Sequence, residues 1–166
     1  MLSGHFLNIR KAHSGDVSLI LEMIRELAAF EQLLDQVIAD EEVLYQSLFV
    51  DPKGPEVLIA EEGDHPVGFV LFFHNFSTFL GKKGIYIEDL YVREKYRGKG
   101  YGEVILTRIC QLAVERNCGR VEWWVLNWNE KAIRFYKKMG AVPMTDWTVF
   151  RLAEESMQKL LDNYEI

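Results

Sequence analysis

One stretch near the middle of the chain, YIEDLYVREKYRGKGYGE from Tyr86 to Glu103, constrains the fold more than any other. An apolar run typical of a β-strand ends in a loop that holds Gly98, Gly100 and Gly102, and a helical pattern begins at Tyr101. Glycines between a strand and a helix let the backbone amides converge on an anion, which the helix dipole also favours. The stretch therefore predicts a strand, a phosphate-binding loop and a helix.

The charge around this loop is opposite to that of the whole chain. The chain has 25 acidic and 19 basic residues and a formal net charge of −6, yet three cations surround the glycines: Lys95, Arg97 and Lys99. A plain turn with solvated lysines is one alternative. A dinucleotide-binding loop is another, because Glu122 follows Gly102 at a suitable spacing, but that pattern requires a glycine where this chain has Glu103. A nucleotide-triphosphate loop is excluded, because no Gly-Lys-Ser/Thr follows the glycines.

Length and composition narrow the class of protein. The 166 residues predict a single domain, residues 1–166, and the acidic balance argues against a nucleic-acid partner. No apolar run approaches the roughly 20 residues of a membrane span, and the first residues lack a signal-peptide pattern. Cys110 and Cys118 have no CxxC spacing, so we expect reduced thiols and a cytoplasmic location. The four histidines have no metal-ligand spacing, so we expect no metal.

The remaining patterns predict a mixed α/β (α+β) fold with a central sheet flanked by helices. Strands are expected at residues 6–11, 56–61, 67–73, 85–92, 120–126 and 147–152. Helices are expected at residues 17–28, 41–49, 101–116 and 129–139, with a further helix at the end of the chain.

The loop RGKGYG (97–102) fits the R/Q-x-x-G-x-G/A acetyl-CoA loop of the GNAT acetyltransferases. Three further segments, RELAAFEQLLDQV (25–37), GIYIEDLYV (84–92) and NWNEKAIRFYKKMGA (127–141), resemble the diamine acetyltransferases in the same order. That group includes the spermidine/spermine and thialysine N-acetyltransferases. The resemblance implies a GNAT fold with a mostly antiparallel sheet, acetyl-CoA as cosubstrate, a small-molecule amine as substrate and a homodimer.

The resemblance also implies which residues hold the coenzyme. The amides of the glycine loop would bind its pyrophosphate. Asn129 matches a coenzyme-contacting asparagine of the family, although its position alone is typical of a helix cap. The residues implied are Leu90, Tyr91, Val92, Arg97, Gly98, Lys99, Gly100, Tyr101, Gly102, Glu103, Asn129, Lys131 and Ala132.

Acetyl transfer to an amine requires the neutral amine, so a proton must be removed, and an acid that donates to the departing thiolate assists its release. Glu88 and Asp89 lie in an apolar strand, where neighbours point to opposite faces unless the strand bulges. The resemblance implies Glu88 as the base, acting through water, with Asp89 in support, and Tyr136 as the acid. A solvent-exposed strand end for the two carboxylates and a core position for Tyr136 are the structural alternatives.

Glu31 extends the apolar face of the first helix, where a carboxylate is costly unless it has a partner such as a cationic substrate. A frayed last turn that leaves Glu31 in water is the alternative. The family implies further substrate contacts at Ser77, Phe79, Glu88, Asp89, Glu122, Trp123, Trp124, Asp146 and Trp147, the last two reaching the partner subunit's substrate channel. Packing in the core is the alternative for the tryptophans.

Ser77 stands where the polyamine branch of the family has an acidic residue, and STF (77–79) is closer to the Ser-Thr-Trp of the thialysine branch. We therefore expect a lysine analogue to be preferred over spermidine. The sequence leaves two other functions open, a protein or peptide lysine acetyltransferase and a module that senses acyl-CoA without catalysis.

Overall fold

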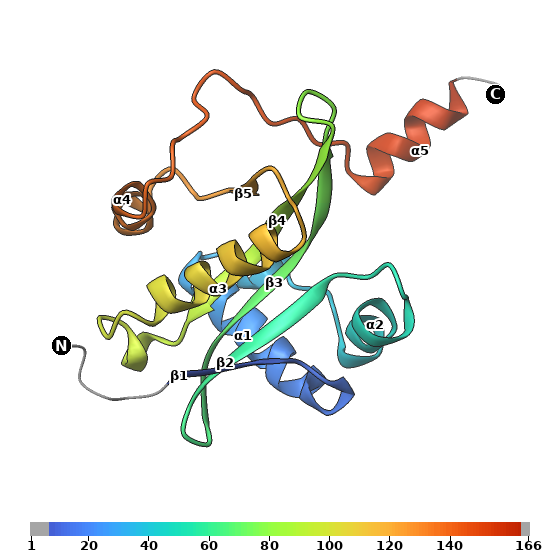
Figure 1. Ribbon diagram of the computed structural model, residues 1–166. Helices are drawn as coiled ribbons and strands as arrows, with labels where there is room; N and C mark the ends of the chain where they lie inside the picture. The colour runs from blue at the N-terminus through green and yellow to red at the C-terminus, as the bar shows by residue number, and fades with distance from the viewer. Residues whose placement is uncertain (1–6, 164–166) are drawn as a thin grey trace. The chain divides into compact units, whose positions relative to one another are not determined.

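The computed structural model describes residues 7–163 (Figure 1). Within the chain two compact units are distinguished, Met1–Trp124 and Val125–Ile166. The first holds the sheet and most of the helices, and the second holds two short helices and their connections. The expected strand residue Phe6 lies outside the described residues.

The first unit is built on one five-stranded sheet with the order β1-β2-β3-β4-β5. Strands β1 to β4 pair antiparallel with their neighbours, whereas β4 and β5 pair parallel. The prediction of a mixed, mostly antiparallel sheet is confirmed. The strands are β1 (Leu7–Lys11), β2 (Glu56–Glu62), β3 (His65–Ser77), β4 (Lys82–Val92) and β5 (Val121–Trp123).

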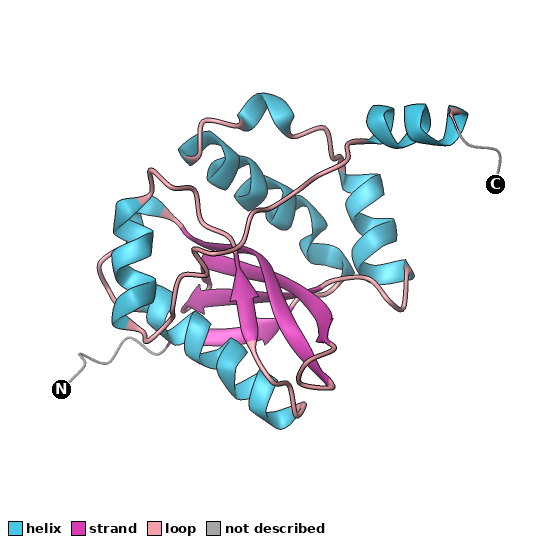
Figure 2. Cartoon of the chain, turned by 90° about the horizontal axis from the view of Figure 1, so that it is seen from above, coloured by secondary structure: helices cyan, strands magenta, loops and turns pink. Residues whose placement is uncertain are grey.

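Helices cover both faces of this sheet (Figures 1 and 2). Helix α1 (Val17–Phe30) buries Ile20 and Met23 against one face, where they meet Ile59, Phe69 and Tyr91. Helix α3 (Tyr101–Glu115) lies on the opposite face and buries its own apolar stripe, Ile105, Leu106, Ile109 and Leu112. Side chains alternate between the two faces of a strand. Since helices cover both faces of this sheet, its central strands carry apolar side chains on both.

The shorter elements connect this framework. A 3-10 turn (Ser14–Asp16) precedes α1, and another (Leu34–Gln36) follows it. Helix α2 (Glu41–Tyr45), capped by the Asp40 carboxylate, continues into a π-helical turn (Gln46–Val50). A third 3-10 turn (Glu94–Tyr96) leads from β4 to the glycine loop.

The second unit contains α4 (Glu130–Lys138) and α5 (Glu154–Asp162). The predicted strand at residues 147–152 is wrong, because this segment is irregular. Its apolar side chains remain in solvent, with Trp147 71% and Phe150 90% exposed. A strand pattern produces a strand only where a neighbouring strand pairs with its backbone, and the described part of the chain places none beside these residues.

Candidate active site

Strand β4 bulges at its two adjacent carboxylates. Leu71 of β3 pairs with Asp89 and the next β3 residue, Phe72, pairs with Ile87, so Glu88 is left without a partner. An extra residue of this kind bends a strand and re-aims its side chains. Glu88 is exposed and Asp89 is half-buried. The bulge provides the condition under which both carboxylates can serve one site.

Three carboxylates gather at this bulge: Glu31, Glu88 and Asp89, named here the acidic cluster. Burial, together with the neighbouring charges of Glu88 and Glu31, raises the pKa of Asp89 to about 6. Glu31 is the C-cap of α1, its N–H donates to Leu27 O at 2.9 Å, and burial raises the pKa of its carboxyl too. Neighbouring carboxylates that are partly removed from water are stabilised by a positive charge, so they provide a favourable site for a cation.

Strands β4 and β5 pair over only three residues, from Ile85 opposite Val121 to Ile87 opposite Trp123. Among the residues that the structure describes, β4 then continues to Val92 with a strand partner on its β3 side only. A strand that pairs on one side directs about half of its N–H and C=O groups to the other side. Residues 88–92, which include the predicted coenzyme residues Leu90, Tyr91 and Val92, therefore present a backbone edge. Val92 O at this edge accepts from Arg97 Nε, and the groups that remain can bind an extended ligand.

The glycine loop has the geometry that an anion site requires. Gly98 and Gly100 have φ of 81° and 84°, values that favour glycine, and a Cβ added at either would meet no atom within 4 Å. Gly100 is the N-cap of α3 and makes no side-chain cap hydrogen bond. The first amides of a helix have no partner within the helix. In the described chain no side chain caps the start of α3, so its first amides are suited to a pyrophosphate.

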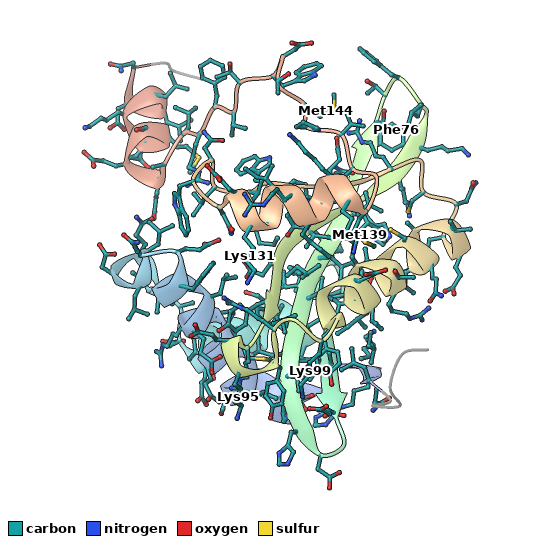
Figure 3. All side chains as sticks on the ribbon, turned by 90° about the vertical axis from the view of Figure 1, so that its left-hand side faces the viewer. Phe76, Lys95, Lys99, Lys131, Met139 and Met144 are labelled. Atoms are coloured by element: carbon teal, nitrogen blue, oxygen red, sulfur yellow. The ribbon has the colours of Figure 1, made fainter. Side chains whose placement is uncertain are left out.

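The cations near this loop are engaged in different ways. The Arg97 Nε donates to Val92 O at 2.9 Å, and the guanidinium stacks 4.4 Å above the ring of Phe30. Lys99 forms an ion pair with Glu62 at 3.1 Å, and Lys95 lies 4.9 Å above the ring of Tyr96. Figure 3 shows Lys95 and Lys99 projecting from the same region of the molecule. Arg97 therefore ties the loop to β4 and to the end of α1.

Several predicted substrate residues have other partners within this unit. Glu122 accepts a hydrogen bond from Asn75 Nδ2 and forms an ion pair with Arg120 Nε, both at 2.8 Å. Trp123 is half-buried on β5, and Trp124, 58% exposed, packs edge-on against Tyr86 with ring centroids 5.9 Å apart. Glu122 thus helps to hold β5 beside β3 and β4.

Ser77 and Phe79 lie far from the acidic cluster within this chain. Ser77 is buried and its Oγ accepts a hydrogen bond from Leu80 N at 3.2 Å, which closes the turn between β3 and β4. It follows Leu71, the partner of Asp89, by six residues, roughly 20 Å at about 3.3 Å per residue. Phe79 is 94% exposed in the same turn. One lysine-sized molecule cannot reach both this Ser77 and the acidic cluster.

The second unit carries the remaining predicted residues. Asn129 caps α4, with its Oδ1 accepting from Ala132 N at 3.2 Å, so its local role is the cap that its position suggests. Tyr136 lies about two turns beyond Asn129 on α4, half-buried and 5.2 Å from the ring of Phe135. Lys131 is the exposed second residue of α4, and Asp146 and Trp147 are exposed in the segment that follows this helix.

The sequence analysis did not identify Glu62 at the end of β2. Its carboxylate accepts a hydrogen bond from the buried Tyr101 hydroxyl at 2.5 Å and binds Lys99. No local pattern pairs residues 37 and 39 positions apart, so only the sheet register could reveal this contact. Among residues 7–163 no group of three or more metal-ligating side chains is found, and none of the helices is long and apolar enough to cross a membrane.

Comparison with known proteins identifies the family. Residues 21–141 match the model of the Acetyltransferase (GNAT) family. A thialysine N-epsilon-acetyltransferase of Bos taurus is 37% identical, covering 93% of this chain and 97% of the relative. An L-ornithine N5-acetyltransferase of Arabidopsis thaliana is 34% identical, covering 95% and 90%.

Among solved structures, an integron cassette protein from V. cholerae superposes with a TM-score of 0.78 at 25% identity, covering 95% of this chain and 98% of the other. The sequence matches and the shared fold lead to one conclusion. The chain belongs to the GNAT acetyltransferase family and is an N-acetyltransferase.

Proposed function

We propose that the chain transfers the acetyl group of acetyl-CoA to a primary amine of a small cationic substrate. The observation that carries this proposal is the arrangement along β4. The acidic cluster at its bulge suits a cation, and the uncapped glycine loop, which begins five residues beyond Val92, suits the anionic coenzyme. The family match spans residues 21–141, across the boundary between the two units, which supports their acting as one acetyltransferase domain over residues 1–166.

The amides from Gly98 to Glu103 would hold the pyrophosphate of the coenzyme, and the open edge of β4 at residues 90–92 would bind its extended arm. The family resemblance adds Asn129, Lys131 and Ala132 from α4. Arg97 supports this site by fixing the loop to Val92 O and Phe30. A metal is not required by this chemistry, because the thioester is already activated.

Arg97→Ala is expected to raise the KM for acetyl-CoA by roughly 10-fold while kcat changes less, because the lost bonds order the loop and take no part in proton transfer. The KM of Arg97→Lys for acetyl-CoA should lie between those of the wild type and Arg97→Ala, since an ammonium cannot stack as a planar guanidinium does. Steady-state kinetics with varied acetyl-CoA measures both. A loss confined to kcat would contradict this role.

The proposed transfer is direct. The amine nitrogen forms a bond to the thioester carbonyl carbon and the bond from that carbon to sulfur breaks. The acidic cluster takes the amine proton, with Glu88 acting through a water and Asp89 beside it. Tyr136 protonates the thiolate. The raised pKa of Asp89, about 6, supports this site, because a proton acceptor works best when its pKa is near the working pH.

The acceptor is proposed to be an amino acid with a side-chain amine, in preference to spermidine. Two relatives support this proposal, since their names include thialysine and L-ornithine. The position of Ser77, in a turn roughly 20 Å along β3 from the cluster, means that within one chain its hydroxyl does not select the carboxylate end of the acceptor. The acidic cluster would hold the ammonium end.

The experiment that tests this function is coenzyme A release from acetyl-CoA across an amine panel at constant salt: thialysine, L-ornithine, lysine, putrescine and spermidine. We expect the highest kcat/KM for an amino acid of the panel and lower values for the diamine and for spermidine. A clear preference for spermidine would refute the acceptor assignment. If no small amine reacts while lysine-containing peptides do, the chain is a peptide acetyltransferase, and binding of acetyl-CoA without any transfer would identify a sensor.

We also propose that the enzyme is a homodimer and works in the cytoplasm. Apolar side chains exposed in residues 142–152, with Trp147 and Phe150 among them, support association with a second copy. The two free cysteines, Cys110 and Cys118, suit a reducing compartment. Sedimentation equilibrium and cell fractionation test these two proposals.

A further inference from the structure

A single carboxylate holds two residues of the glycine loop. Glu62, at the end of β2, accepts from Lys99 Nζ at 3.1 Å through both of its oxygens. Its Oε1 also accepts from the Tyr101 hydroxyl at 2.5 Å. Glu62, Lys99 and Tyr101 are named here the Glu62 clamp. The clamp joins the β2–β3 hairpin to the start of α3.

The Glu62 clamp combines an ion pair to Lys99, whose side chain is 42% exposed, with a part-buried hydrogen bond from Tyr101. Tyr101 is only 5% exposed, and the side chain of Glu62 is 19% exposed. Exposed ion pairs contribute little to stability, whereas a partly buried carboxylate that accepts several charge-assisted bonds holds its partners firmly. The Lys99 ammonium also lies 5.3 Å above the ring of Tyr96 and 5.7 Å above that of Tyr101, which restricts its position further.

The clamp acts where the loop is least constrained by its own sequence. Lys99 stands between Gly98 and Gly100, and Tyr101 is the first residue of α3. Glycines lose more conformational entropy on ordering than other residues, so a loop that must present its amides in one arrangement benefits from an external constraint. Ordering the loop before the ligand arrives lowers the entropy cost of binding.

Electrostatics alone predicts the opposite effect. A carboxylate beside an anion site repels the anion, and Glu62 also compensates the charge of Lys99, one of the three cations that distinguish this loop. On charge alone, removal of the Glu62 carboxylate should strengthen coenzyme binding. The two effects differ in sign, so one substitution separates them.

We propose that Glu62 is a positioning residue for the coenzyme, which holds Lys99 and Tyr101 so that the amides of the glycine loop are arranged for the pyrophosphate before it binds. This inference rests on the proposed function, because it takes coenzyme A as the ligand of the loop. Glu62 itself contacts the loop side chains and acts through them.

The test is Glu62→Gln, with the Kd for coenzyme A measured by titration calorimetry and the kinetic constants measured in parallel. The clamp predicts that the Kd for coenzyme A and the KM for acetyl-CoA rise together by roughly 5- to 30-fold, the effect of losing about 1–2 kcal/mol of hydrogen bonding to a charged group. The kcat and the KM for the amine should change by less than about twofold. Binding that is unchanged or tighter would overturn the proposal.

Glu61→Gln is the matched control. It removes the same charge from the adjacent residue, whose carboxylate binds Arg10 Nε at 2.9 Å and Asn8 Nδ2 at 3.2 Å. The Kd for coenzyme A should stay within about twofold of the wild-type value. An equal rise in Glu61→Gln would assign the effect to general loosening of β2 and overturn the clamp.

Tyr101→Phe provides a second, milder test if Glu62→Gln does not fold. It keeps the buried ring and removes only the hydroxyl that donates to Glu62. A rise of the Kd in Tyr101→Phe alone would support the clamp. Where Glu62→Gln does fold, a smaller further rise on combining the two substitutions would support a shared constraint. If wild-type protein does not bind coenzyme A, the proposed function fails and the clamp with it. Wild-type binding with both variants unaffected refutes the clamp alone.

Discussion

Tyr136→Phe is expected to lower kcat by roughly 10- to 10⁴-fold, the range over which one acid-base group acts, while the Kd for coenzyme A stays nearly unchanged. The substitution removes the hydroxyl that we propose donates a proton to the departing thiolate. The ring, which packs 5.2 Å from that of Phe135 on α4, is retained. Steady-state kinetics together with calorimetric binding of coenzyme A separates the chemical step from binding.

Tyr45→Phe is a suitable control for this prediction. Tyr45 lies at the end of α2, packs 6.3 Å from the ring of Phe49 and is 40% exposed, and its hydroxyl has no role in the proposed transfer. The kcat of the Tyr45→Phe variant should equal that of the wild-type enzyme. If Tyr136→Phe is fully active, Tyr136 is a packing residue and another group protonates the thiolate.

The second large effect concerns Asp89, whose substitution should change stability and activity in opposite directions. Burial and two neighbouring carboxylates raise the pKa of Asp89 from 3.8 to about 6, so the folded state binds this proton more tightly than the unfolded state does. The stabilising contribution is complete below about pH 3.8 and is lost as the pH rises through about 6, because the folded protein must then hold a desolvated charge.

Asp89→Asn removes that charge. The variant should be more stable than the wild type above pH 6, by an amount on the order of 1–3 kcal/mol, and close to it near pH 4. Urea denaturation at the two pH values measures the difference. At neutral pH the same variant should lose at least 10-fold in kcat/KM for the amine, because the cluster is less able to attract and deprotonate a cation. Equal stability at both pH values would contradict a partly desolvated, charged Asp89 at neutral pH.

Glu88→Gln is the companion variant, since Glu88 lies beside Asp89 but is exposed at the bulge. Its loss of activity should be greatest at low pH, where the neutral amine is scarcest, and should diminish as the pH approaches the pKa of the amine. An unchanged rate and pH profile in Glu88→Gln, alongside a large loss in Asp89→Asn, would assign the base to Asp89.

Much of the candidate site could be proposed from sequence because the chemistry that it needs is local. The glycine loop needs glycines at positions 98 and 100 for their positive φ, and such residues between a strand and a helix predict an anion site without further information. The adjacent carboxylates at 88 and 89 are also conspicuous from sequence, because charged residues are unusual within an apolar strand. The strand and helix periodicities predicted all five strands of the sheet, with differences at their ends.

Tertiary structure decided which of these residues meet. The bulge at Glu88, the burial of Asp89 and its approach to Glu31 depend on how β4 pairs with β3 and where α1 ends. The engagement of Glu122 by Asn75 also depends on the neighbouring strands. Burial and partners are properties of the surroundings, and no local pattern encodes them.

The two clearest differences have the same physical cause. Residues 147–152 have a strand pattern but no strand beside them in the described chain, so their backbone hydrogen bonds cannot form a ladder. Glu62 has no distinguishing pattern, yet the sheet brings it to Lys99 and Tyr101. The sequence by itself determined the chemical groups and their local conformations, and the tertiary structure decided their partners, because a hydrogen bond or a pKa shift depends on atoms distant in the chain but close in space.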